Sequence, residues 1–102
     1  MAKKTIPIAC SLTDVEFRKR REGLLDEIKT GILETSEIKN GFIFSFPKDD
    51  SWILKLAEMI TLERECCPFL NFKMNINANK NLFSLELSGQ KGTKEFVSSL
   101  FL

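Results

Sequence analysis

The chain has 102 residues, a length at which one domain can form its own hydrophobic core, and we expect a single domain over residues 1–102. Hydrophobic residues make up 43% and charged residues 28%, which is typical of a soluble globular domain and excludes a disordered tail or a fibre. The net charge of +1 gives no reason to expect nucleic acid as a partner. The chain contains no His, which excludes a Ser-His-Asp triad and a His-ligated metal site.

The N-terminal segment does not have the pattern of a signal peptide. Lys3 and Lys4 are followed by only a short apolar stretch, which Pro7 interrupts. No window reaches the roughly 18 consecutive apolar residues that favour a membrane helix. We therefore expect a cytoplasmic protein that has no membrane as partner, and we expect that compartment to keep its three cysteines as thiols.

Cap and turn patterns divide the chain into eight short elements. Thr13 and Glu16 form a capping box ahead of the first helix. Asn40-Gly41 is a strong hairpin signal, because both positions of such a turn need a positive φ. In chain order we expect a strand over 5–9, a helix over 14–29, strands over 32–39 and 42–46, a helix over 52–67 capped by Asp49-Asp50-Ser51, strands over 72–76 and 83–87, and a last helix capped by Thr93.

The order β-α-β-β-α-β-β-α groups the strands as hairpins rather than as parallel units. It predicts an α+β fold with two layers, a mostly antiparallel sheet and helices on one face, as a ferredoxin-like variant with an added strand. Phe42, Phe44 and Phe46 alternate with Ile43 and Ser45 along one strand. Since successive side chains of a strand point to opposite faces, the three Phe rings are predicted to lie in the core.

The most distinctive chemistry lies at the end of the second predicted helix, where Cys66 and Cys67 follow Glu63. At about 100° per residue these three side chains gather at one end of one helix face. A carboxylate beside an apolar stripe needs a partner, and Arg21 or Arg18 of the first helix is the expected one. The predicted stripe consists of Ile53, Leu56, Ala57, Ile60 and Cys67, with Cys66 and Met59 on its flank.

Three interpretations of the cysteines remain open. Cys67 can be a core residue and Cys66 a bystander, in a non-catalytic interaction module such as a homodimer formed through an exposed strand edge. Cys66, Cys67 and Cys10 can instead ligate a soft metal or metalloid ion, with Glu63 and the two arginines around them. The third interpretation is a thiol-dependent redox enzyme. The end of a helix argues against it, because the macrodipole there disfavours a thiolate.

The segment Leu62–Phe72 carries the pattern E-R-x-C-C-P-F-L-x-F, and nearly the whole chain resembles a small bacterial family in which this pattern is the most specific motif. Members of that family are sometimes placed near heavy-metal resistance functions. The resemblance assigns no catalytic role to any residue. The other matching segments are Ile8–Thr13, Gly41–Pro47 and Ser88–Phe96, and the residues that the resemblance singles out are Cys10, Arg21, Glu63, Cys66, Cys67 and Phe69, the last as a pocket residue.

These observations favour a cytoplasmic, thiol-bearing accessory protein that binds a soft metal or metalloid ion through the Cys66–Cys67 pair. Such an ion is the one cofactor that the sequence suggests. Whether the protein is an enzyme stays open at this stage.

Overall fold

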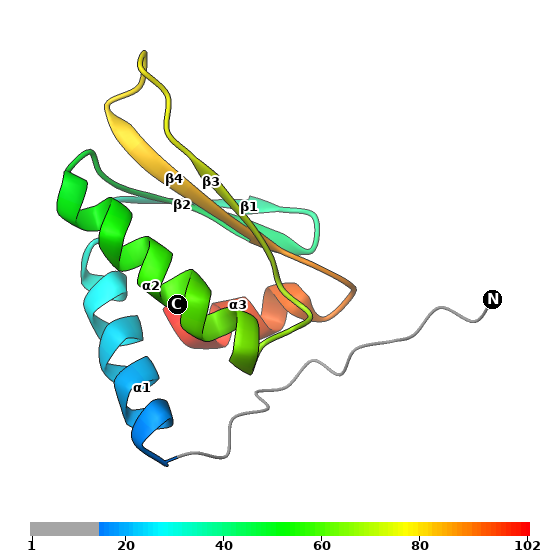
Figure 1. Ribbon diagram of the computed structural model, residues 1–102. Helices are drawn as coiled ribbons and strands as arrows, with labels where there is room; N and C mark the ends of the chain where they lie inside the picture. The colour runs from blue at the N-terminus through cyan, green and yellow to red at the C-terminus, as the bar shows by residue number, and fades with distance from the viewer. Residues whose placement is uncertain (1–14) are drawn as a thin grey trace.

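The computed structural model describes residues 15–102. The expected strand over 5–9 and the expected cap at Thr13 lie outside these residues. Within them, no helix combines the length and the apolar composition that crossing a membrane requires. The elements are α1 (Val15–Thr30), β1 (Glu34–Ile38), β2 (Gly41–Pro47), α2 (Asp50–Cys66), β3 (Asn71–Asn75), β4 (Leu82–Ser88) and α3 (Thr93–Phe101) (Figure 1).

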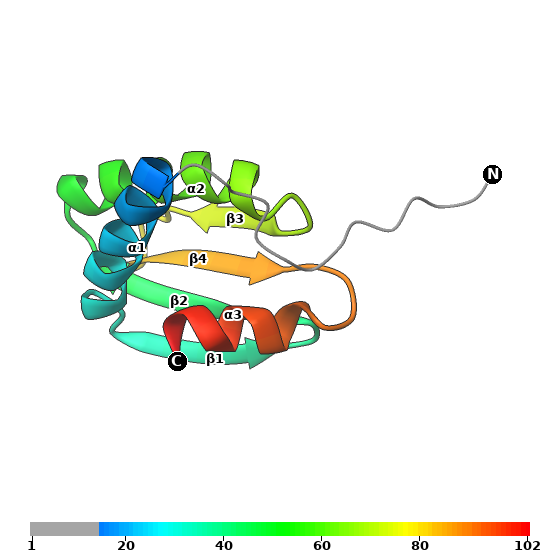
Figure 2. The same cartoon turned by 90° about the horizontal axis from the view of Figure 1, so that it is seen from below.

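The four strands form one sheet in the order β1-β2-β4-β3, and every neighbouring pair is antiparallel. Two hairpins, β1–β2 and β3–β4, are joined through β2 and β4, where Phe44 lies opposite Leu85. The three helices lie on one side of this sheet (Figures 1 and 2). The α+β class, the antiparallel pairing and the single helical face confirm the prediction.

The core lies between the helices and the face of the sheet that carries the Phe residues. Phe42, Phe44 and Phe46 are buried, whereas Ile43 and Ser45 are partly exposed on the other face. The same alternation continues in β4, and the ring of Phe44 packs 5.2 Å from that of Phe101 in α3. The predicted role of the Phe row as sheet core is therefore confirmed.

The turn between β1 and β2 differs from the prediction by one residue. Ile38 pairs with Gly41, so the turn is Lys39–Asn40 and Gly41 already belongs to β2. Asn40 has a φ of 59°, while the φ of Gly41 is not positive. Gly41 is required by packing instead, because a Cβ atom there would overlap the carbonyl oxygen of Leu87 in β4. The Asn-Gly pattern thus indicates the hairpin correctly, but only Asn40 serves the turn conformation.

The two helix caps have different outcomes. Asp49 caps α2 as expected, since its side chain accepts a hydrogen bond of 2.9 Å from the backbone N–H of Ser51. The expected cap at Thr93 is wrong, because Gly92 occupies that position with a φ of 99° and Thr93 is the first residue of α3. The Thr93 side chain is buried, and its hydroxyl has no hydrogen-bond partner among the described residues.

Candidate metal centre

A buried ion pair joins α1 to α2. The Nε atom of Arg21 donates a hydrogen bond of 2.9 Å to Oε1 of Glu63. Only 2% of the Glu63 side chain and 11% of the Arg21 side chain are exposed to solvent. The expected contact between Glu63 and an arginine of the first helix is therefore present through Arg21, whereas Arg18 is exposed.

Cys67 approaches the same carboxylate from the end of α2. Its thiol donates to Oε2 of Glu63 at 3.3 Å, and its backbone N–H donates to the Glu63 carbonyl oxygen at 2.6 Å. Cys67 leaves the helical conformation, with φ −126° and ψ 72°. Pro68 explains this, because a proline disfavours the α region for the residue before it.

This break in the helix brings two neighbouring cysteines to one site. In a continuous helix, adjacent side chains point about 100° apart and diverge. Here the side-chain ligand atoms of Glu63, Cys66 and Cys67 all lie within 4.8 Å of one another, and the three residues are buried. The sequence predicts that the three residues cluster, but the non-helical backbone of Cys67 is what brings its sulfur atom close to the other two ligand atoms.

The buried face of α2 is rotated from the predicted stripe. Ala57, expected inside, is exposed, and Cys66, expected on the flank, is completely buried. The prediction placed Glu63 beside the stripe with an arginine of the first helix as its partner, and Arg21 does neutralise Glu63 in the interior. The buried residues of α2 are Leu56, Met59, Leu62, Glu63 and Cys66.

The environment of Cys67 disfavours its thiolate. Burial raises the pKa of the Cys67 thiol to about 12, and the negative charge of Glu63 and the hydrogen bond to it act in the same direction. Arg21 opposes them only weakly, with its Nη2 atom 3.9 Å from Sγ. At neutral pH Cys67 is therefore a protonated thiol, and it lacks the thiolate character that a redox or nucleophilic cysteine needs.

The two cysteines of the site differ in their bonding. Cys67 is a free thiol, whereas Cys66 is disulfide-bonded. The expectation that every cysteine is a thiol is therefore wrong at Cys66. Cys10, the expected third sulfur ligand, also lies outside the described residues. The donor set that the structure describes is two sulfur atoms and one carboxylate.

A depression of about 500 Å³ opens beside this cluster and has Cys67 in its wall. Phe69, which was expected in a pocket, does not line this depression. It is buried, and its ring packs edge-to-face on Phe96 with the centroids 4.9 Å apart. The other residues that line the depression are Ile60, Arg64, Pro68, Leu70, Asn71 and Phe72.

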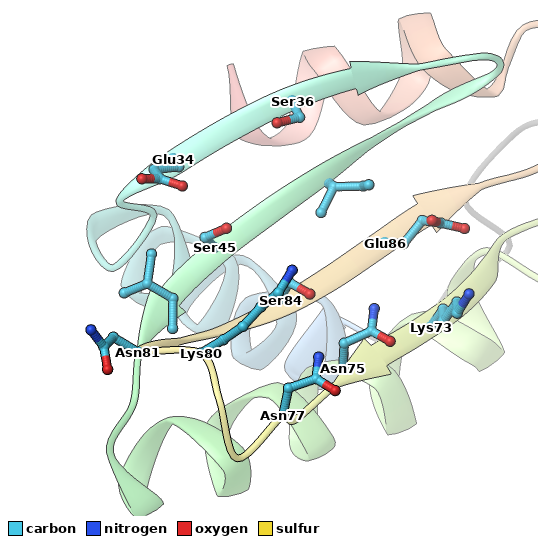
Figure 3. Close-up of a pocket in the computed structure, with 12 residues that line it drawn as sticks. Glu34, Ser36, Ser45, Lys73, Asn75, Asn77, Lys80, Asn81, Ser84 and Glu86 are labelled. Atoms are coloured by element: carbon cyan, nitrogen blue, oxygen red, sulfur yellow. The ribbon is translucent and has the colours of Figure 1, made fainter.

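A second concavity, of about 680 Å³, lies on the sheet face that points away from the helices (Figure 3). The strand register places Ser45 of β2 opposite Ser84 of β4, and these short side chains leave the middle of the face hollow. Longer side chains, among them Glu34 and Lys73, stand at the margin. Because the sheet separates it from Cys67, this concavity is not part of the candidate site formed by Glu63, Cys66 and Cys67.

Comparisons with known protein families, with curated proteins and with solved structures give no match to this chain. The functional argument therefore depends on the chemistry of the residues themselves.

Proposed function

We propose that this protein, with Cys66 in the reduced state, binds a soft divalent metal ion through Cys66, Cys67 and Glu63. The observation that carries the proposal is the position of the three donor atoms, buried and all within 4.8 Å of one another. Two thiolates and one carboxylate are typical ligands of Zn²⁺, and the sulfur atoms favour thiophilic ions of the same charge such as Cd²⁺ and Hg²⁺.

The spacing is close to what such an ion needs. With metal–sulfur bonds of about 2.3 Å, two sulfur ligands of a tetrahedral ion lie about 3.8 Å apart. The two sulfur atoms must therefore approach by about 1 Å at most. Cys67 lies beyond the last residue of α2, so a rotation of its side chain leaves the helix unchanged. The depression beside Cys67 supplies a route to the site and room for a further ligand from solvent.

Charge balance favours a divalent ion over a monovalent one such as Cu⁺. Glu63 and Arg21 already neutralise each other in the buried site. If both cysteines lose their protons, the two thiolate charges equal the charge of one divalent ion. A monovalent ion would leave a negative charge in the interior, where an uncompensated charge is costly. A divalent ion thus replaces two protons with no change in buried charge.

The remaining parts of the proposal rest on the sequence. The resemblance of Leu62–Phe72 to a family placed near heavy-metal resistance supports an accessory role in handling such ions. A reducing cytoplasm is the compartment in which Cys66 would be maintained as a thiol.

A titration of the fully reduced protein with Cd²⁺, followed by native mass spectrometry, tests the proposal. We expect one bound ion per chain and a loss of affinity of at least about 100-fold in Cys67→Ser. Glu63→Gln removes the carboxylate ligand and should weaken binding as well. Glu58→Gln is the matched control, because Glu58 lies on the same helix, is exposed and pairs with Arg20.

The outcome that contradicts the proposal is a folded, fully reduced wild-type protein that takes up no Cd²⁺. Equal affinities of the wild type and Cys67→Ser would do the same, since the ion would then be bound elsewhere. Circular dichroism and the urea midpoint of each variant separate a lost ligand from a lost fold.

A further inference from the structure

The three proposed ligands leave one position of a tetrahedral ion open, and the following inference rests on the proposed function. A Zn²⁺ ion that has three protein ligands keeps a fourth position for water or another molecule. Of the three ligand residues, Cys67 alone lines the depression of about 500 Å³ beside the cluster. A fourth ligand therefore reaches the ion from this depression, on the Cys67 side of the site.

The wall of this depression combines apolar surface with one positive charge. Arg64 lies in the last turn of α2, shortly before Cys67, and lines the same depression. It is exposed, and it takes part in none of the ion pairs formed within residues 15–102. The apolar residues of the wall are Ile60, Pro68, Leu70 and Phe72. A small molecule with an apolar stem and an anionic group matches both parts of this wall.

From this arrangement we infer that the protein receives its ion as a complex with a small thiol that carries a carboxylate, and that one such thiol stays bound. Its thiolate occupies the fourth position on the ion, and its carboxylate pairs with Arg64. A guanidinium suits this role, because its N–H donors match the two oxygen atoms of a carboxylate. The substrate is thus a soft divalent ion in complex with carboxylate-bearing thiols.

The transfer is a ligand exchange in which no atom is oxidised or reduced. An ion that arrives with two thiolates forms bonds to the sulfur atoms of Cys66 and Cys67 and to Glu63, and its bond to one of the two thiolates breaks. Of the two cysteine protons, one leaves with the departing thiol and the other goes to solvent. The thiolate that stays adds one negative charge on the side of the depression, where Arg64 and solvent reduce its cost.

The test uses three thiols that share one short stem and differ in the charge at its end. 3-Mercaptopropionate carries a carboxylate, 2-mercaptoethanol a neutral hydroxyl and 2-aminoethanethiol an ammonium group. The protein is reduced with dithiothreitol, freed of it in oxygen-free buffer, loaded with one equivalent of Cd²⁺ and titrated with each thiol. Native mass spectrometry counts the ions and thiolates that stay bound. We expect a ternary adduct of protein, Cd²⁺ and one 3-mercaptopropionate.

Arg64→Met is the decisive variant, since it keeps an apolar side chain and removes the charge. It should weaken the 3-mercaptopropionate adduct about fivefold more than the 2-mercaptoethanol adduct, and it should strengthen the 2-aminoethanethiol adduct. Comparison between thiols corrects for their different intrinsic affinities for Cd²⁺. Arg64→Lys retains the charge and should keep most of the preference for the carboxylate. Arg20→Met is the matched control, because Arg20 is exposed and pairs with Glu58 outside the depression.

The possible outcomes separate the inference from the proposed function. A protein that binds Cd²⁺ but forms no ternary adduct with any of the three thiols would overturn the inference and leave the metal site standing. An equal effect of Arg64→Met on the carboxylate and hydroxyl thiols would also overturn it, because Arg64 would then act only on the end of the helix. If the reduced protein takes up no Cd²⁺ before a thiol is added, the proposed function itself is wrong.

Discussion

Replacement of Arg21 by Met should expose the energetic importance of the buried pair between α1 and α2. The side chain of Glu63 is 2% exposed, and its Oε1 atom receives the 2.9 Å hydrogen bond from Arg21. Without the guanidinium the carboxylate stays in the interior with no opposite charge. Loss of one partner of such a pair costs about 3–5 kcal/mol in the free energy of unfolding. For a chain of this length that corresponds to a fall in Tm of about 15–25 °C.

Urea unfolding at neutral pH, followed by circular dichroism, measures this cost. Arg20→Met is the matched control, because Arg20 lies on the same helix in an exposed pair with Glu58 and should contribute less than about 1 kcal/mol. The double variant Arg21→Met, Glu63→Met removes both charges and should recover most of the lost stability. A loss below about 1 kcal/mol in Arg21→Met, or no recovery in the double variant, would refute the reasoning.

Three further substitutions test other parts of the structure. Folding raises the pKa of the Cys67 thiol from 9.0 to about 12. The protonated thiol therefore stabilises the folded state below pH 9, and this contribution is lost as the pH rises towards 12. Urea midpoints measured across this pH range should fall less steeply in Cys67→Ala than in the wild type. Gly41→Ala forces a Cβ atom onto the Leu87 carbonyl oxygen and should lower the free energy of unfolding by about 1–3 kcal/mol, and an unchanged urea midpoint would contradict this account. Thr93→Val removes a buried hydroxyl that has no partner among residues 15–102, so its thermal midpoint should match or exceed that of the wild type; a loss of more than about 1 kcal/mol would point to a hydrogen bond that this account omits.

Periodicity and capping patterns predicted the fold class well. The alternation of Phe42, Phe44 and Phe46 is a local pattern, and burial of one sheet face follows from it directly. Asp49 could be identified as a cap because its interaction is with Ser51, two residues away. Thr93 is also a residue type that commonly caps helices, but its side chain is buried and Gly92 takes the cap position. The burial of Thr93 depends on distant segments and cannot be predicted from the neighbouring sequence.

The clustering of Glu63, Cys66 and Cys67 was predicted, whereas Cys10, the other predicted sulfur ligand, lies outside the described residues. The spacing of Glu63, Cys66 and Cys67 is enough to place them at one end of a helix, and the need of a carboxylate beside an apolar stripe for a partner pointed to Arg21 or Arg18. The burial of Cys66 was missed, because the predicted stripe included Ala57, which is exposed, and placed Cys66 on its flank.

The sequence by itself determined the hairpins and the clustering of Glu63, Cys66 and Cys67 at one end of a helix, since each depends on residues that are close along the chain. Only the tertiary structure decided the strand order β1-β2-β4-β3, the choice of Arg21 rather than Arg18, and the complete burial of both Cys66 and Cys67. These depend on which distant segments meet, and that is set by the packing of the whole core rather than by any local pattern.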